Sequence, residues 1–79
     1  MKGYNVLYII CFELVFRRRD IISFIQTSLP EVRVTSIDLC DRQFTMSINM
    51  PQYQAGLVEN IVAQKGLTIT LLRIEENIL

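Results

Sequence analysis

The stretch that most constrains this chain is residues 4–12, YNVLYIICF, in which eight of the nine residues are apolar or aromatic. A short run that is rich in Val, Ile, Tyr and Phe is typical of a β-strand rather than a helix. Both of its alternating sets of side chains are apolar, which predicts a strand that is covered on both faces. We therefore expect residues 4–12 at the centre of a sheet.

Length and charge balance limit the classes of function. The 79 residues predict a single domain over residues 1–79, and an apolar content of 51% is high for so small a chain. We therefore expect a partner to cover part of the apolar surface. Eight Lys and Arg residues balance eight Asp and Glu residues, so no overall positive field attracts nucleic acid or an anionic membrane, although a local site stays open.

The cysteines bear on metal binding and on the cell compartment. Cys11 and Cys40 are far apart in sequence, no CxxC pair is present, and the chain has no His. These ligands are too few for an ordinary zinc site, and we expect neither a metal nor another cofactor. Nothing else indicates a cystine-stapled secreted domain, so we expect reduced thiols in a cytoplasmic protein, with a disulfide as the alternative.

The apolar segment near the N-terminus also invites comparison with a signal peptide or a membrane span. It is too short to cross a bilayer. It ends in Glu13 and three arginines, and no small-residue cleavage site follows. We interpret it as a strand, with a membrane anchor as the alternative, and expect no direct membrane insertion.

Helical and strand patterns alternate along the rest of the chain. We predict helices over residues 18–28 and 51–65, and strands over residues 32–41, 43–50 and 67–74. Pro30 ends the first helix, and the second begins at Pro51 and ends at Gly66. The spacing of apolar residues supports these assignments.

Several finer expectations follow from the same patterns. A change of phase near Thr35 and Ser36 predicts either a bulge in the second strand or a strand that starts later. In the second helix, Gly56 predicts a close backbone approach. The apolar face of that helix is expected to hold Leu57, Val58, Ile61 and Val62. Residues 13–16 are expected to form a connection, and residues 75–79 show no pattern.

The order strand, helix, strand, strand, helix, strand predicts an α+β fold. It is the order of a ferredoxin-like βαββαβ plait, a four-stranded antiparallel sheet with two helices on one face and the first and third strands in the middle. The other face would stay open, so we expect a second copy or another domain to bury it. The residues assigned to this dimer or partner face are Tyr4, Val6, Tyr8, Ile10, Leu72 and Ile74.

No catalytic constellation is present in the sequence. The chain lacks a His for base chemistry, and its three glycines are too scattered for a phosphate-binding loop. Asp38 and Asp41 are close in sequence, but we interpret them as a solvated hairpin end rather than an acid/base pair. We therefore expect that the protein is not an enzyme.

Arg17, Arg18 and Arg19 form the one unusual charged segment, at the start of the first predicted helix. Cations at a helix N-terminus oppose the helix dipole, at the end that already attracts anions. A carboxylate ligand, a phosphate or an acidic partner would relieve this conflict. The alternative is a solvated basic loop that Glu13 and Asp20 partly neutralise.

The order of elements, the length and these sites resemble the ACT family of small regulatory domains, and more loosely the ACT-like C-terminal domains of the MgtC family of bacterial membrane proteins. ACT domains usually carry an aspartate and a glycine in the loop after the first strand, where an amino-acid ligand binds. Here that loop reads ELVFRRRD and has no glycine. The resemblance implies pairing of sheets between copies, side by side or face to face, and a regulatory or assembly role.

Other uses of the plait fit less well. The third strand, RQFTMSINM, has a single aromatic residue and lacks the glycines of an RNA-binding RRM. A copper chaperone would need CxxC, and acylphosphatase chemistry would need a glycine loop beside the arginines. The sequence thus predicts a regulatory or assembly module that dimerises or docks on a partner domain and binds no nucleic acid. The alternative is a sensor of a small anion or amino acid with its site at Arg17, Arg18 and Arg19.

Overall fold

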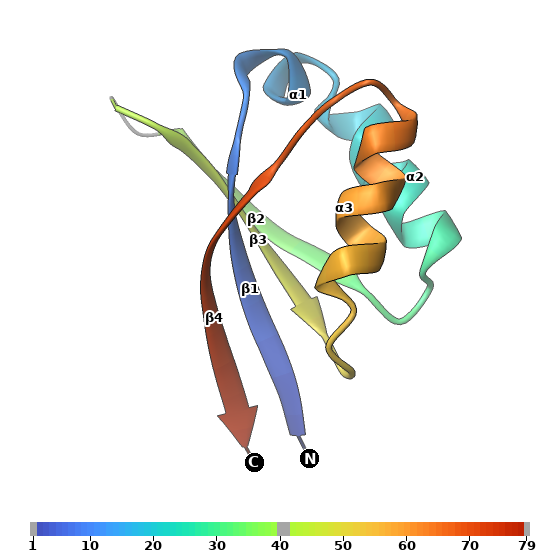
Figure 1. Ribbon diagram of the computed structural model, residues 1–79, viewed down its shortest axis with the longest axis vertical. Helices are drawn as coiled ribbons and strands as arrows, with labels where there is room; N and C mark the ends of the chain where they lie inside the picture. Colours follow the sequence, from blue (N-terminus) through green and yellow to red (C-terminus); the bar gives the residue numbers. More distant parts are fainter. Residues whose placement is uncertain (1, 40–41, 79) are drawn as a thin grey trace.

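The computed structural model describes residues 2–39 and 42–78, and these form four strands and three helices (Figure 1). In chain order the elements are β1 (Lys2–Ile10), α1 (Phe12–Phe16), α2 (Arg18–Ser28), β2 (Arg33–Leu39), β3 (Phe44–Met50), α3 (Ala55–Gln64) and β4 (Thr70–Ile78). The strands make one antiparallel sheet. The expected α+β class and four-stranded antiparallel sheet are confirmed.

The strand order β2-β3-β1-β4 places β1 and β3 in the middle, as the sequence predicts. β1 pairs with β3 from Tyr4 opposite Met50 to Ile10 opposite Phe44. Its other side pairs with β4, and β2 pairs with the free side of β3. β2 and β4 are therefore the edges of the sheet.

Helices α2 and α3 lie next to each other on one side of the sheet, and α1 lies at the end where β1 finishes (Figure 1). The core fills the space between these two helices and the sheet. Its buried residues come from every helix, from the two central strands β1 and β3, and from the connections before β2 and β4. They are Val6, Tyr8, Ile10, Leu14, Val15, Ile21, Ile25, Val32, Met46, Ile48, Met50, Ala55, Val58, Ile61, Val62, Leu67 and Ile69. In the described part of the chain, every helix falls short of the length and hydrophobicity that crossing a bilayer requires.

The assignment of Val6, Tyr8 and Ile10 to an open face is wrong. Each of these side chains is at most 5% exposed and lies in the core beneath the helices. The reason is the pairing with β3, whose even-numbered residues are apolar and whose odd-numbered residues 45, 47 and 49 are polar. Directly paired residues share a face, so the apolar set of β3 draws the even-numbered set of β1 into the core.

Both edge strands carry an irregularity. The β2–β3 register shifts between Val34 and Ser36, which confirms the bulge expected there. The β1–β4 register shifts between Leu7 and Tyr8, whose partners are Arg73 and Leu71. Leu72 is therefore an extra residue in β4, which the sequence pattern did not reveal.

Helix α3 begins later than expected. It starts at Ala55 rather than Pro51, because β3 continues to Met50 and residues 51–54 form the connection. Leu57 is 50% exposed rather than part of the buried face. The expected close approach at Gly56 is also wrong, since a Cβ there would meet nothing within 4 Å. Gly66 ends the helix region at a φ of 78°, as predicted for a C-terminal glycine.

Two segments without a clear pattern are regular structure. Residues 13–16, expected as a connection, lie in α1, where Leu14 and Val15 are buried. β4 begins at Thr70 rather than at residue 67, and it extends to Ile78 because residues 75–78 pair with the first residues of β1. Main-chain hydrogen bonds to a neighbouring strand hold such a segment without side-chain alternation.

Candidate functional site

The arginine segment lies at the junction of α1 and α2. The backbone N–H of Arg17 donates to the carbonyls of Glu13 and Leu14, both at 3.1 Å, and the Arg17 carbonyl accepts from the N–H of Ile21 at 2.9 Å. The chain thus passes from one helix to the next while helical hydrogen bonding continues. No side chain caps the start of α2. The three arginines therefore lie at the junction itself, where the sequence predicts them.

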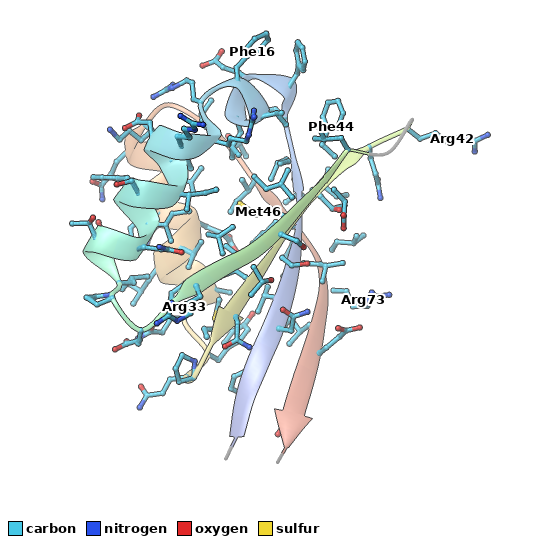
Figure 2. The ribbon with its side chains drawn as sticks, turned by 180° about the vertical axis from the view of Figure 1, so that it is seen from behind. Phe16, Arg33, Arg42, Phe44, Met46 and Arg73 are labelled. Carbon is cyan, nitrogen blue, oxygen red and sulfur yellow. The ribbon has the colours of Figure 1, made fainter. Side chains whose placement is uncertain are left out.

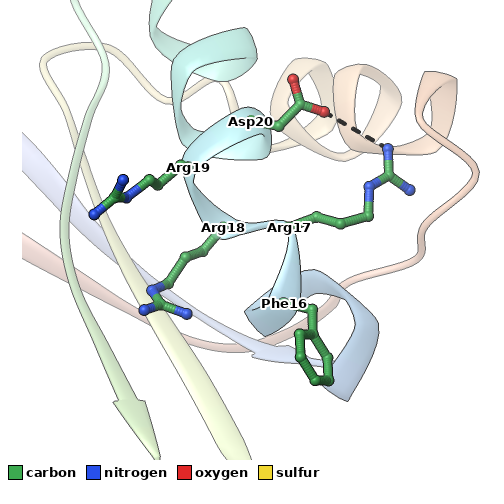
Figure 3. Close-up of a pocket in the computed structure, with 5 residues that line it drawn as sticks. All are labelled: Phe16, Arg17, Arg18, Arg19 and Asp20. Atoms are coloured by element: carbon green, nitrogen blue, oxygen red, sulfur yellow. Dashed lines mark ion pairs between the residues drawn. The ribbon is translucent and has the colours of Figure 1, made fainter.

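Arg17 is already neutralised within the fold. Its guanidinium lies 3.4 Å from the Glu13 carboxylate and 3.7 Å from that of Asp20 (Figure 3). It also donates to the carbonyl of Lys65 at 3.2 Å, and the Lys65 ammonium lies 3.5 Å from the same Asp20 carboxylate. Arg17 thus ties the α1–α2 junction to the end of α3, and its charge is shared among protein groups.

Arg18 and Arg19 are differently placed. Figure 3 shows both side chains directed away from Arg17 and Asp20. Arg18 donates to the Val15 carbonyl at 2.9 Å, whereas the Arg19 side chain has no hydrogen bond or ion pair to the part of the chain that the structure describes. With residues 16, 17 and 20, they line an open hollow of about 380 Å³. The charge available to an anion there comes from Arg18 and Arg19.

The open face of the sheet is more polar than the sequence predicts. In the central strand, Leu7 and Ile9 point to this face and are half-buried. Their partners in β3 are Ser47 and Thr45, and Asn49 continues the row. The apolar surface is therefore a narrow strip along β1, flanked by hydroxyl and amide groups.

The edge strand β4 carries more exposed apolar surface. Leu71, Leu72 and Ile74 are 40–45% exposed, so Leu72 and Ile74 are the two members of the expected partner face that stay accessible. Their neighbours Arg73 and Glu75 form an ion pair of 3.3 Å along the strand. Tyr4, another member of that face, is half-buried and its ring packs edge-on against Tyr53 at 5.6 Å.

Tyr8 has a buried hydroxyl group that forms a hydrogen bond within the fold. Its Oη donates to the Ala55 carbonyl at 3.2 Å, in the first turn of α3. Burial raises the pKa of Tyr8 far above its ordinary value, and the nearby Glu59 carboxylate adds to this shift. The phenol therefore stays protonated at neutral pH, and it joins the central strand to the helix above it.

The remaining polar candidates do not converge on a centre. Cys11 is exposed and free, and Asp38 is exposed on β2. Cys40, the second cysteine of the alternative disulfide, and Asp41, which is near Asp38 in sequence, lie outside the described residues. Within residues 2–39 and 42–78, no three His, Cys, Asp or Glu side chains come close enough together to hold a metal ion.

A surface cluster that the sequence analysis missed lies around α1. Phe12 and Phe16 are exposed, and their rings meet at 4.8 Å between centroids. The sequence pattern predicts Phe12 in the covered strand and Phe16 in a connection. Phe12 and Phe16 are four residues apart, and residues at this spacing lie on one side of a helix. The spacing indicates a cluster only if residues 12–16 are helical, which the sequence pattern did not predict.

Comparison of this chain with protein-family models, with curated proteins and with solved structures finds no match.

Proposed function

We propose that this chain is a non-catalytic regulatory or assembly module that acts by pairing with a second copy through β4. The observation that supports this is the character of β4. It is a nine-residue strand at the edge of the sheet, and three of its apolar side chains are 40–45% exposed. An edge of this length offers backbone donors and acceptors to another strand.

The proposal includes a ferredoxin-like plait of the ACT-like type. The strand order β2-β3-β1-β4 and the position of α2 and α3 on one side of the sheet support it (Figure 1). In this interpretation α1 is an additional turn of helix in the first crossover. ACT-like modules pair side by side or face to face, and the two modes use different surfaces of the plait.

The polarity of the open face favours the side-by-side mode. Face-to-face pairing would bury Thr45, Ser47 and Asn49 against another sheet, and buried hydroxyl and amide groups without partners destabilise an interface. Side-by-side pairing leaves these groups in water. It covers Leu71 and Ile74 instead, which the fold leaves half-exposed.

The charges along β4 fit a two-fold axis. An antiparallel pair of β4 strands centred on Ile74 places Arg73 of each copy opposite Glu75 of the other, and places the two Ile74 side chains together. Opposite charges in directly opposed positions stabilise a strand pair. With this centre, the Leu72 bulge restricts regular pairing to residues 73–75 of each copy, so the interface is small and we expect a reversible dimer.

Sedimentation equilibrium over a dilution series tests the proposal. We expect a dimer of twice 9.2 kDa at high concentration. Arg73→Glu and Glu75→Arg should each weaken it by placing like charges opposite one another, and the double variant R73E/E75R should restore it. Arg33→Glu on β2, the other edge, is the matched control and should leave the mass unchanged.

Two results would contradict pairing through β4. One is a folded monomer at every concentration. The other is a dimer that neither charge reversal weakens, or that R33E weakens equally.

A second candidate is the sensing of a small anion, and the hollow lined by Arg18 and Arg19 favours it. Titration with inorganic phosphate should shift the amide NMR signals of residues 16–21 to saturation. Arg19→Gln should abolish the shift, whereas Arg33→Gln should preserve it. Signals that do not move, or that move equally in both variants, would remove this candidate.

A further inference from the structure

The most exposed large apolar side chains in the described part of the chain lie at one end of the molecule. Phe16, Leu39 and Phe12 are 74%, 61% and 59% exposed, the highest values among the large apolar side chains that the structure describes. Together with the half-buried Phe44 they form what we call the aromatic end. It lies opposite the start of β1 and the end of β4 (Figure 1).

The aromatic end is one continuous surface built from separate elements. Phe12 in α1 packs against Phe16 at 4.8 Å and against Phe44 in β3 at 6.0 Å. Leu39 in β2 lies directly opposite Phe44 in the register. Figure 2 shows Phe16 and Phe44 at the same end of the molecule. The large exposed fractions of Phe12 and Leu39 mean that these two side chains project outward. Phe16 is also mostly exposed, and it lines the open hollow next to Arg18 and Arg19.

Positive charge surrounds this surface. Arg18 and Arg19 lie two and three residues after Phe16, and Arg42 lies at the same end as Phe44 (Figure 2). None of the three has an ion pair to a carboxylate in the described residues. Of the neighbouring acids, Glu13 and Asp20 are both paired with Arg17, whereas Asp38 is exposed next to Leu39.

We propose that the aromatic end docks on an anionic membrane surface. Phe12, Phe16 and Leu39 would enter the headgroup region, where amphipathic surfaces bury their apolar side chains to a shallow depth. The guanidinium groups would bind lipid phosphates, for which their planar donors are well suited. Charge complementarity supports an anionic surface, and projecting side chains suit a deformable lipid layer better than a protein groove.

This inference is independent of pairing through β4, because the two surfaces share no residue. A peripheral contact of this kind would orient the module with the aromatic end toward the membrane. The start of β1 and the end of β4 would then point away from it. The local positive charge also explains how a chain with zero net charge can select an anionic surface.

Vesicle co-sedimentation of the full chain tests the inference. We expect binding to vesicles of phosphatidylcholine with phosphatidylserine, weakening as salt is raised, and little binding to phosphatidylcholine alone. Arg19→Gln combined with Arg42→Gln should reduce the partition coefficient by roughly tenfold or more, given the effect of each cation near such a surface. Arg33→Gln, a charge removed elsewhere, is the control.

The contribution of the apolar side chains to membrane binding is tested with the variant Phe16→Ser, alone and combined with Phe12→Ser. Both side chains are mostly exposed, so circular dichroism should show a folded protein and partition should fall severalfold. Leu57→Ser is the matched control, because Leu57 is half-exposed on α3 away from the aromatic end. Its partition coefficient should not change.

Three outcomes would overturn the inference. The first is the absence of binding to either vesicle. The second is binding that F16S and R19Q/R42Q leave unchanged, or that L57S and R33Q reduce equally. The third is saturable binding of free inorganic phosphate without binding to vesicles, which would assign the arginines to a soluble anion.

Discussion

The even-numbered and odd-numbered side chains of β1 are almost equally apolar in sequence, yet they differ in burial. Val6 and Tyr8 are completely buried beneath the helices, whereas Leu7 and Ile9 are half-buried on the open face. The difference comes from the neighbouring strand β3, where only one set of residues is apolar. A central strand can therefore be apolar on both faces while the sheet has one core.

The largest loss of stability is expected from a substitution on the face of the sheet that the helices cover. Ile48 lies opposite Val6 and is fully buried, so Ile48→Ala should lower the free energy of unfolding by about 2–5 kcal/mol through lost burial and an unfilled cavity. Its neighbour Ser47 lies opposite Leu7 on the open face, and Ser47→Ala should stay within about 0.5 kcal/mol of the parent. Urea denaturation measures both. Equal losses would show that the two faces do not differ in packing.

Tyr8→Phe gives an intermediate effect. It removes the hydrogen bond to the buried Ala55 carbonyl, which should cost about 1–3 kcal/mol. The pKa of Tyr8 is raised by folding, so its hydroxyl contributes stability that is fully present below the tyrosine pKa of the unfolded chain, about 10. That contribution is lost as the pH rises above this value.

Chemical denaturation between pH 8 and 11 would measure this effect, with pH values chosen to bracket the ordinary tyrosine pKa of about 10. The parent protein should lose stability over the upper part of this range more steeply than Tyr8→Phe. Parallel curves for the two proteins would contradict the coupling between Tyr8 ionisation and folding.

The smallest effect is expected on the open face. Leu7→Thr keeps a residue that favours strands, and it should change the free energy of unfolding by less than about 1 kcal/mol. It should also leave the mass in solution unchanged, because pairing through β4 does not use this face. A loss of dimer in Leu7→Thr would instead indicate face-to-face pairing. The open face of the sheet, rather than β4, would then be the interface.

Most of the secondary structure could be predicted from local patterns. The helix over residues 18–28 and the strand ending at Met50 agree with the apolar periodicity and with Pro30. The start of α3 was misplaced because Pro51 is as compatible with the turn before a helix as with its first position. Residues 75–78 were missed because their order depends on pairing with β1, which is far away in the sequence.

The candidate site was only partly predictable. The segment from Arg17 to Arg19 does lie at a helix start. The sequence could not show that Arg17 pairs with Glu13 and Asp20, whereas Arg19 has no ion pair with any residue that the structure describes. The aromatic end was missed because Phe12, Leu39 and Phe44 lie in three different elements. Their proximity depends on the strand register and not on spacing along the chain.

The sequence by itself determined the order of the strands and of the two longer helices, the α+β class and the central place of the first strand, because local periodicity and strong apolar runs are encoded residue by residue. Tertiary structure alone decided which face of β1 is buried and which arginines stay available. It also decided where exposed apolar side chains gather. These properties depend on which residues from distant segments oppose each other, since a side chain's burial is set by its neighbours in space.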